Sequence, residues 1–347
     1  MKMCSAFVLL CFSLQYLKVS GGFDIKGNID VAPVVLVHGG AGSIPPEYEE
    51  EKINGMKNAV REGWNMLQSS DNALNAAISA VKIMEDDPAF NAGRGSKLTI
   101  LGQVEMDAAV MDGKQMEAGG VACLKGIKHP IEAARSVMEN SSHVLLVGEG
   151  AGKFAIKNGG EEVGDDWLIT DRSRQLLDEY LRNHNISHID SEMIWTFEHL
   201  GHQFGHGTVG AVVVDTHGNL AAATSTGGIT GKIPGRVGDS PSVGHGVFAD
   251  NLSAAISCTG SGETFMKAGV ARRIASKIEM GLSPKDAAEE ALEYMKVRVG
   301  GSGGVIVLDP TGNIGIHWNS KQMAWAYAKD GKLHYGINVG EDFIEDL

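Results

Sequence analysis

Two short apolar hairpins constrain the fold of this chain most strongly. In the first, the wholly apolar run Val209–Val214 is followed by a polar turn at residues 215–219 and by a return run at residues 220–223. A second hairpin of the same shape is predicted around the turn at residues 309–313. These runs are too continuously apolar for one face to meet water. We therefore expect antiparallel strands that are buried on both faces.

Helical patterns on either side of these strands predict what covers them. Residues 34–42 predict a short buried strand that ends in a glycine-rich turn. Apolar side chains spaced three or four apart indicate a helix over residues 53–67, and Asp71 can cap a second one. Another helix is predicted over residues 265–280, and a further one begins at Ser283. Doubly buried sheets with paired helices predict an α+β fold of four layers: helix, sheet, sheet, helix.

The segment from about residue 157 to residue 206 differs in character from the rest of the chain. It is rich in charged and polar side chains, with a helical pattern only around Leu177. We interpret it as a solvated connector rather than a domain boundary, because residues 208–347 alone hold few strands and would leave sheet edges open. A single domain spanning residues 23–347 is therefore expected.

The first 22 residues predict a signal peptide. Lys2 supplies a positive charge, an apolar stretch follows, and small residues at positions 20–22 offer a cleavage site. The stretch is shorter than the roughly 20 apolar residues that a spanning helix needs. We expect a secreted or endomembrane-lumenal protein if the segment is removed, and a cytoplasmic one otherwise. Only Cys123 and Cys258 follow this segment, too few for a disulfide framework.

Composition and spacing exclude several function classes. The formal net charge of −13 argues against a non-specific nucleic-acid surface, which is normally basic. No later stretch is apolar enough to cross a membrane. The glycine-rich turn after residue 37 lacks both the G-x-G-x-x-G spacing and the following lysine of nucleotide-binding loops. His202 and His206 have helical spacing but no third ligand nearby, so no side-chain metal site is expected.

Thr208 opens the first apolar strand, directly after Gly207 and the polar connector. A threonine hydroxyl is a poor nucleophile and needs a base. An N-terminal α-amine, with a pKa of roughly 7.7 to 8.0, can be that base, and Thr208 gains one only if the chain is cut before it. A hydroxyl fixed at a strand start beside a glycine peptide could attack that peptide. The alternative is an ordinary threonine at a strand start.

Three further motifs could complete such a site. Thr226 ends the return strand near Thr208 and could orient its hydroxyl, although strand propensity alone would also explain it. Arg236 and Asp239 present opposite charges three residues apart, which suits the carboxylate and ammonium of an amino acid; a surface ion pair is the alternative. Thr259 stands in a glycine-rich turn that could stabilise an oxyanion or could simply begin a helix.

These motifs occur in an order that resembles one family. The chain is similar to the plant-type L-asparaginase/isoaspartyl peptidase family of N-terminal nucleophile hydrolases. The likeness covers nearly everything from Pro33 to the C-terminus, apart from the connector. It rests on the runs at residues 38–42, 85–93, 106–108, 111–113, 207–212, 224–228, 235–241 and 259–263.

The resemblance implies an αββα fold and self-cleavage between Gly207 and Thr208. The products would be an alpha chain, residues 23–207, and a beta chain, residues 208–347, which stay associated. The resemblance makes Thr208 the nucleophile. The other implied roles are hydroxyl orientation by Thr226, binding of the substrate carboxylate by Arg236 and of its amine by Asp239, an oxyanion hole at Thr259 and Gly260, substrate contact at Gly262, and a place beside the site for Asn91.

The implied reaction is hydrolysis of L-asparagine and β-aspartyl dipeptides, with release of L-aspartate through a β-aspartyl ester. No cofactor is expected, apart from a structural sodium that family members hold on backbone carbonyls in the loop at residues 84–94. A homodimer of cleaved protomers is also implied. Arg94 and Lys97 make this loop more basic than the family pattern. His206 and the signal-like N-terminus are further departures.

Two other functions remain as alternatives. Glycosylasparaginase, a lysosomal relative that removes sugar from asparagine, would suit a secretory N-terminus. Against it, the run at residues 90–93 and the scarcity of cysteine fit the asparaginase branch better. The second alternative, of another class, is an uncleaved, non-enzymatic, secreted binding protein. Against it, all the expected catalytic residues are present.

Overall fold

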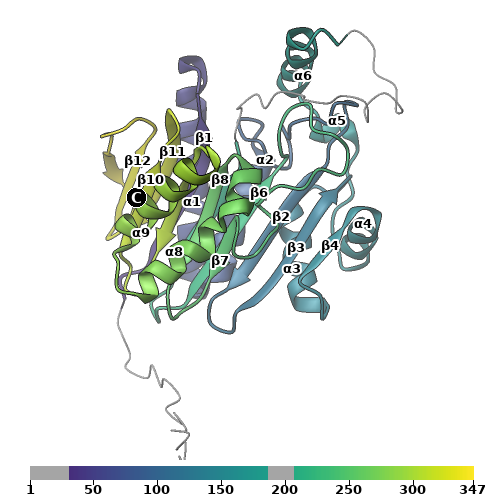
Figure 1. Cartoon of the computed structure of the whole chain (residues 1–347). Coiled ribbons are helices and arrows are strands. Elements are labelled where there is room, and N and C mark those ends of the chain that lie inside the picture. The colour runs from purple at the N-terminus through teal and green to yellow at the C-terminus, as the bar shows by residue number, and fades with distance from the viewer. Residues whose placement is uncertain (1–30, 187–206) are drawn as a thin grey trace, which may run out of the picture.

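The computed structural model describes residues 31–186 and 207–347, so the predicted signal peptide lies outside the described residues. A mixed sheet of nine strands forms the centre, in the order β13-β12-β11-β1-β5-β6-β2-β3-β4 (Figure 1). The one parallel pair in it is β3 with β4. In chain order its strands are β1 (Val34–Gly42), β2 (Met106–Asp112), β3 (Glu117–Leu124), β4 (Leu145–Val147), β5 (Val209–Val214), β6 (Leu220–Thr226), β11 (Gln322–Lys329), β12 (Lys332–Gly336) and β13 (Phe343–Asp346).

A second sheet of four strands packs against one face of the first. Its strands, in the spatial order β10-β9-β8-β7, are β7 (Val247–Ala249), β8 (Ala255–Gly260), β9 (Gly303–Leu308) and β10 (Ile314–Trp318). Both predicted hairpins are confirmed, since β5 pairs with β6 and β9 pairs with β10. Each turn is closed in the same way. Asp215 Oδ1 accepts a hydrogen bond from the Asn219 amide at 2.8 Å, and Asp309 Oδ1 accepts one from the Asn313 amide at 3.0 Å.

Side chains along the central strands alternate between two cores. On β1, Val34 and Leu36 pack between the two sheets, whereas Val35 and Val37 pack toward the helices on the other face. All four are fully buried. Successive side chains of a strand point to opposite faces of the sheet, and in this run both sets are apolar. The prediction of strands buried on both faces is therefore confirmed for β1, β5, β6 and β9, whereas β10 is mostly half-buried.

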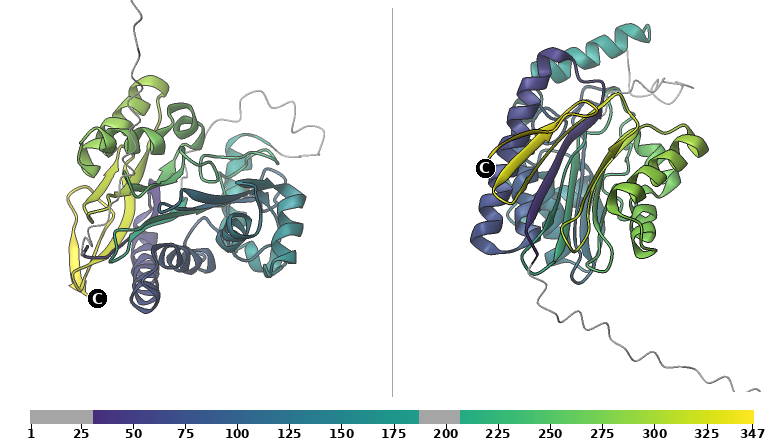
Figure 2. Two further views of the ribbon diagram at one scale, coloured as in Figure 1. Left: turned by 90° about the horizontal axis from the view of Figure 1, so that it is seen from below. Right: turned by 90° about the vertical axis from the view of Figure 1, so that its left-hand side faces the viewer.

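Helices cover the outer faces of both sheets, as Figure 2 shows. The nine-stranded sheet is covered by α1 (Glu49–Ser70), α2 (Ala73–Asp86) and α3 (Pro130–Asn140), and the four-stranded sheet by α8 (Val270–Glu279) and α9 (Pro284–Val299). The predicted α+β class is confirmed. The remaining helices of the described residues are a 3-10 turn (Pro46–Tyr48), α4 (Gly148–Lys157), α5 (Asp165–Leu168), α6 (Asp171–Asn183) and α7 (Gly262–Ala268).

Strands from before and after Gly207 interleave in the large sheet. Strand β1 lies between β11 and β5, both of which follow Gly207 in the chain, and β6 pairs with β2, which precedes it. Each half of the chain therefore completes sheet edges that the other half would leave open.

Two local predictions within the N-terminal half of the chain are wrong. Residues 38–42 form no turn but continue β1, with a shift of register between His38 and Ala41 against β11. Asp71 does not cap the second helix. It ends α1 in a left-handed conformation, with φ of 44°, and the side chain of Asn72 instead accepts a hydrogen bond from the Asn75 amide at the start of α2.

The helix predicted over residues 265–280 is divided. Gly269, with φ of 60°, ends α7 and separates it from α8. Ser283 begins α9 as predicted, because its hydroxyl accepts a hydrogen bond from the Asp286 amide. The connector is described as far as residue 186, and this part contains α5 and α6. His202 and His206 lie outside the described residues. Within residues 31–186 and 207–347, no helix is long and apolar enough to cross a membrane.

Candidate active site

Thr208 lies buried at the start of β5, next to the end of β6. The hairpin pairs Val209 with Ser225, which places Thr208 beside Thr226. The Thr208 hydroxyl donates to Thr226 Oγ1 at 3.2 Å, and the same oxygen accepts from the Gly228 amide at 3.0 Å. The predicted approach of the two threonines is therefore present in the structure.

A small pocket surrounds the Thr208 side chain. Its volume is about 10 Å³, room for no more than about one water molecule. In this intact chain the pocket is too small for an amino acid. It brings together most of the site residues predicted from sequence, because it is lined by Gly207, Thr208, Thr226, Gly228, Ile229, Arg236, Asp239, Ser240 and Gly260.

The two charged residues of the pocket differ in their partners. Arg236 donates to Glu263 through Nε at 2.9 Å and Nη2 at 3.0 Å, a two-point ion pair with a residue that the sequence did not single out for this role. Burial raises the pKa of Asp239 to about 7, although the charge of Arg236 opposes this. Asp239 Oδ2 is buried and has no hydrogen-bond partner among the described residues. It is thus placed to receive a donor from a ligand.

Gly262 lies against both of these charged side chains. A Cβ at this position would stand 2.8 Å from Arg236 Nη2 and 3.0 Å from Asp239 Oδ1. Any larger residue would displace one of the two groups. Gly262 therefore leaves room for the Arg236 and Asp239 side chains.

Thr259 and Gly260 end β8 rather than forming the expected turn. Gly260 lines the pocket and has φ of 150°, a conformation that favours glycine. Thr259 is fully buried, and its hydroxyl oxygen accepts from the Ala41 amide at 3.3 Å. The hydroxyl hydrogen of Thr259 is therefore available to a further acceptor. Of the two residues, only Gly260 is part of the pocket wall.

Asn91 connects its loop to the end of β6. Its Nδ2 donates to the Gly228 carbonyl at 2.7 Å, and its Oδ1 accepts from the Lys97 amide at 2.8 Å. A Cβ on Gly207 would stand 2.9 Å from the Asn91 Cβ. Asn91 thus lies directly beside the predicted scissile peptide, as the resemblance implies.

His38 is a site residue that sequence reasoning missed. Its Nδ1 lies 3.1 Å from the Thr208 carbonyl oxygen, and its Nε2 lies 2.8 Å from Ser257 Oγ. Ser257 in turn lies 2.7 Å from Thr224 Oγ1. Burial lowers the pKa of His38 to about 3, so the ring is neutral and holds the backbone of Thr208 in place. A lone histidine within an apolar strand was the only signal for it.

Lys232 and Asp107 support the two loops of the pocket. The buried Lys232 ammonium donates to the Gly227 carbonyl at 2.9 Å and to the Glu105 carbonyl. Asp107 Oδ2 accepts from the Gly238 amide at 3.3 Å, between Arg236 and Asp239 in the chain. Nothing in the local sequence pattern indicated either contact.

Comparison with known proteins places this geometry in a family. A family model described as asparaginase matches residues 31–337. The chain is 46% identical to an isoaspartyl peptidase/L-asparaginase of Danio rerio, over 91% of this chain and 98% of the relative. Identity is 44% to the Homo sapiens isoaspartyl peptidase/L-asparaginase (91% and 99%) and 40% to a probable isoaspartyl peptidase/L-asparaginase of Drosophila melanogaster (88% and 95%). The chain belongs to the asparaginase family.

Within this asparaginase-family chain, the loop after α2 fits the sodium that the resemblance implies. The carbonyl oxygens of Pro88 and Phe90 lie 2.9 and 2.8 Å from where a Cβ of Gly95 would stand. Two backbone oxygens thus converge beside a residue without a side chain. Oxygen donors of this kind suit a hard cation. Such an ion would brace the loop that carries Asn91.

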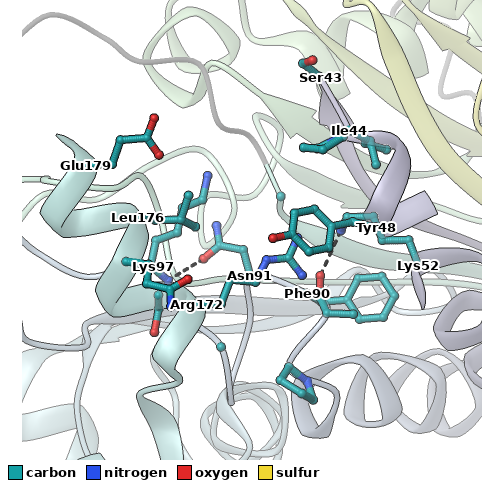
Figure 3. Close-up of a pocket in the computed structure, with 17 residues that line it drawn as sticks. Ser43, Ile44, Tyr48, Lys52, Phe90, Asn91, Lys97, Arg172, Leu176 and Glu179 are labelled. Carbon is teal, nitrogen blue, oxygen red and sulfur yellow. Dashed lines mark hydrogen bonds between the residues drawn. The ribbon is translucent and has the colours of Figure 1, made fainter. Parts of the chain in front are cut away.

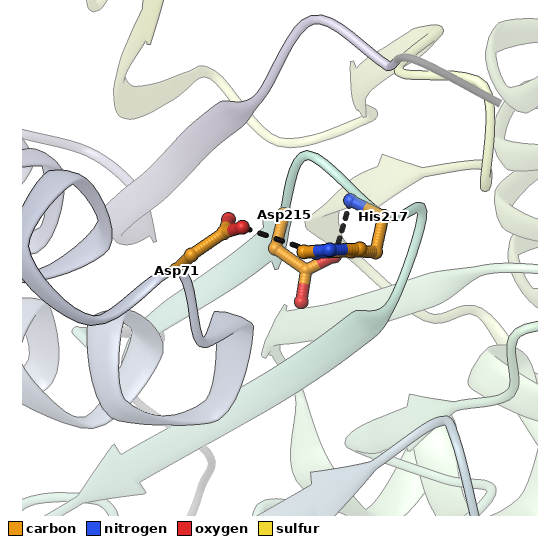
Figure 4. Close-up of side chains that lie close together, drawn as sticks. All are labelled: Asp71, Asp215 and His217. Atoms are coloured by element: carbon orange, nitrogen blue, oxygen red, sulfur yellow. Dashed lines mark hydrogen bonds and ion pairs between the residues drawn. The ribbon is translucent and has the colours of Figure 1, made fainter. Parts of the chain in front are cut away.

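A second polar cluster lies at the far end of the β5–β6 hairpin (Figure 4). Ligand-type atoms of Asp71, Asp215 and His217 lie within 4.8 Å of one another. Their hydrogen bonds are already used within the cluster, since Asp71 accepts from the Thr216 hydroxyl at 2.6 Å and Asp215 accepts from the His217 amide at 3.0 Å. These contacts tie the α1–α2 junction to the hairpin turn, which is a structural role.

Proposed function

We propose that this chain is a self-cleaving threonine hydrolase that acts on L-asparagine and β-aspartyl dipeptides. One observation carries the proposal. The Thr208 hydroxyl, bonded to Thr226, shares a buried pocket with Gly207, Arg236 and Asp239. A nucleophile, a peptide bond to cut, and groups for a carboxylate and an ammonium thus surround one point. The names of the relatives, isoaspartyl peptidase/L-asparaginase, agree with this chemistry.

Self-cleavage would create the base that the reaction needs. The Thr208 hydroxyl attacks the Gly207 carbonyl carbon, the C–N bond breaks, and the proton passes to the departing nitrogen. Water then hydrolyses the ester, which leaves a carboxylate on Gly207 and a free α-amine on Thr208. Because an α-amine titrates near neutral pH, it can take the hydroxyl proton in each later turnover.

Substrate hydrolysis follows the same path. Arg236 binds the substrate α-carboxylate and Asp239 its α-ammonium, so that the side-chain carbonyl faces Thr208. Attack by the Thr208 hydroxyl expels the amine and forms a β-aspartyl ester. Gly260, with Thr259 behind it, would stabilise the oxyanion, and water releases L-aspartate.

The same proposal covers the fold type and the assembly. The layer order of helix, sheet, sheet and helix supports an N-terminal nucleophile hydrolase fold. The interleaved strands support a single domain, residues 23–347, cleaved into 23–207 and 208–347. A homodimer of cleaved protomers and removal of residues 1–22 during secretion are further parts of the proposal. Light scattering and N-terminal sequencing of the purified protein test these two.

Two activities compete with this proposal. A glycosylasparaginase would release sugar from glycosylated asparagine, and an uncleaved binding protein would catalyse nothing. Assaying asparagine, a β-aspartyl dipeptide and glycosylated asparagine side by side separates these cases. Preference for the glycosylated substrate would replace the proposal with the first alternative.

The decisive experiment is intact mass analysis and N-terminal sequencing of the purified protein. We expect a chain that begins Thr208-Val209-Gly210. Thr208→Ala should abolish both cleavage and turnover, and Thr208→Ser should keep part of each, because it retains a hydroxyl. Cleavage or turnover by the alanine variant would falsify the proposed nucleophile.

A further inference from the structure

A second cavity shares Gly207 with the Thr208 pocket as a wall residue. Its volume is about 300 Å³, about thirty times that of the small pocket and enough for an amino-acid residue. Figure 3 shows Asn91 between Lys97 on one side and Tyr48 and Lys52 on the other, and the Arg172 guanidinium lies against the Tyr48 ring. The cavity wall thus carries three cations.

The three cations differ in how many hydrogen-bond and ion-pair partners they already have. Lys52 donates to the carbonyls of Gly39 and Ala89, both at 3.1 Å. The Arg172 guanidinium lies 3.6 Å from the centre of the Tyr48 ring and also 3.6 Å from Glu51.

The Lys97 ammonium, by contrast, has no hydrogen-bond or ion-pair partner within residues 31–186 and 207–347. Burial, together with the charges of Lys52 and Arg172, lowers the pKa of Lys97 to about 7. Glu179 also borders the cavity, but its side chain is exposed to solvent. An anion entering the cavity would therefore favour the charged form of Lys97 and pair with it.

The cavity and the Thr208 pocket are adjacent because Gly207 forms a wall of both. Asn91 packs on Gly207 and accepts from the Lys97 amide, so Gly207, Asn91 and Lys97 are contiguous. Cleavage before Thr208 releases Gly207 from its fixed position. The space that Gly207 leaves would then join the Thr208 pocket to the cationic cavity.

We propose that this cavity binds the leaving residue of a β-aspartyl dipeptide, with Lys97 paired to that residue's α-carboxylate. The proposal rests on the proposed function and adds a preference among its substrates. In a β-aspartyl dipeptide the carboxylate lies two bonds beyond the scissile nitrogen, on the side away from Arg236 and Asp239. Ile44, Tyr48 and Leu176 give the same cavity an apolar surface for the side chain of the leaving residue.

Lys97 would separate the candidate substrates by charge. The amine released from a β-aspartyl dipeptide carries a carboxylate, whereas asparagine releases ammonia and glycosylated asparagine releases a neutral sugar amine. An interaction with that carboxylate is possible only for the dipeptide. It persists from binding through bond cleavage, so it should lower KM more than it raises kcat.

The test compares β-aspartyl-leucine, its C-terminal amide and L-asparagine as substrates of the cleaved enzyme. In Lys97→Gln we expect the ratio of kcat/KM for β-aspartyl-leucine to that for asparagine to fall about tenfold, mainly through KM, as expected for loss of a charge-assisted pair. The ratio for the amide should stay within about twofold. Lys97→Arg should restore most of the dipeptide ratio because it keeps the charge.

Arg94→Gln is the matched control, because Arg94 is the other basic residue of the same loop. It lies over the Trp167 ring and does not line the cavity, so its substitution should leave the ratio unchanged. An unchanged ratio in Lys97→Gln, or an equal fall for all three substrates, would overturn the proposal and leave the proposed function standing. If the wild-type enzyme hydrolysed neither asparagine nor the dipeptide, the proposed function would be wrong, and this inference with it.

Discussion

Thr208 acquires its proposed role from residues that lie far from it in the chain. Thr226 accepts a hydrogen bond from the Thr208 hydroxyl, and His38 is hydrogen-bonded to the Thr208 carbonyl. Asn91 packs on Gly207, the residue before Thr208. Only the first of these contacts arises within one hairpin. The reactivity of this residue therefore depends on packing as much as on the chemistry of threonine.

Asp239 should make ligand binding depend on pH. Its pKa, raised by burial to about 7 against an ordinary value of 3.8, means that the carboxylate is charged only above about pH 7. Affinity for an ammonium group is then present at pH 8 and is lost as the pH falls through 7. We expect L-aspartate to bind the cleaved enzyme about tenfold more weakly at pH 6 than at pH 8, measured by calorimetry.

Succinate is the control ligand for this prediction, since it is aspartate without the ammonium group. Its affinity should change far less over the same pH range, and Asp239→Asn should remove the difference between the two ligands. Equal pH profiles for aspartate and succinate in the wild-type enzyme would show that Asp239 does not receive the ammonium group.

At the scale of elements, the two sheets leave no room for a side chain at Gly210. A Cβ there would stand 2.0 Å from Ser257 Oγ on β8 and 2.6 Å from His38 Nε2 on β1. Gly210→Ala must therefore separate the sheets or break the hydrogen bonds that hold Thr208. We expect a loss of about 1–3 kcal/mol of stability, read from the midpoint of thermal unfolding, and a marked slowing of self-cleavage.

Gly150→Ala gives the comparison for that variant. Gly150 lies within α4, and nothing would lie within 4 Å of a Cβ there. This substitution should leave cleavage unchanged and stabilise the helix by roughly 0.5–1 kcal/mol. If the two variants had the same thermal stability and the same rate of self-cleavage, the predicted effect of crowding between the sheets at Gly210 would be wrong.

For the whole molecule, the interleaved sheet predicts that cleavage will not separate the chains. Strand β1 is hydrogen-bonded to β11 on one side and β5 on the other, and both belong to the other chain. Separation would break both ladders and expose two cores. The cleaved chains should co-elute in size-exclusion chromatography with the uncleaved Thr208→Ala protein and should part only in denaturant. Two separate peaks in native buffer would contradict this.

The local sequence pattern was sufficient to predict structures that form between residues close together in the chain. Continuous apolar runs around polar turns predicted both hairpins, and Ser283 predicted the start of α9. The approach of Thr208 to Thr226 followed from the first hairpin, because a return strand brings its end to the start of its partner. Local reasoning failed at Asp71 and Gly269, where the backbone adopts left-handed conformations that ended one helix and divided another.

By itself, the amino-acid sequence determined the doubly buried strands, the α+β class and the small set of residues gathered around Thr208. Only the tertiary structure decided the interleaving of the two halves, the pairing of Arg236 with Glu263 and the support of Thr208 by His38. The reason is physical. Strand alternation and turns depend on residues a few positions apart, whereas these contacts join residues 27 and 170 positions apart and exist only once the layers have packed.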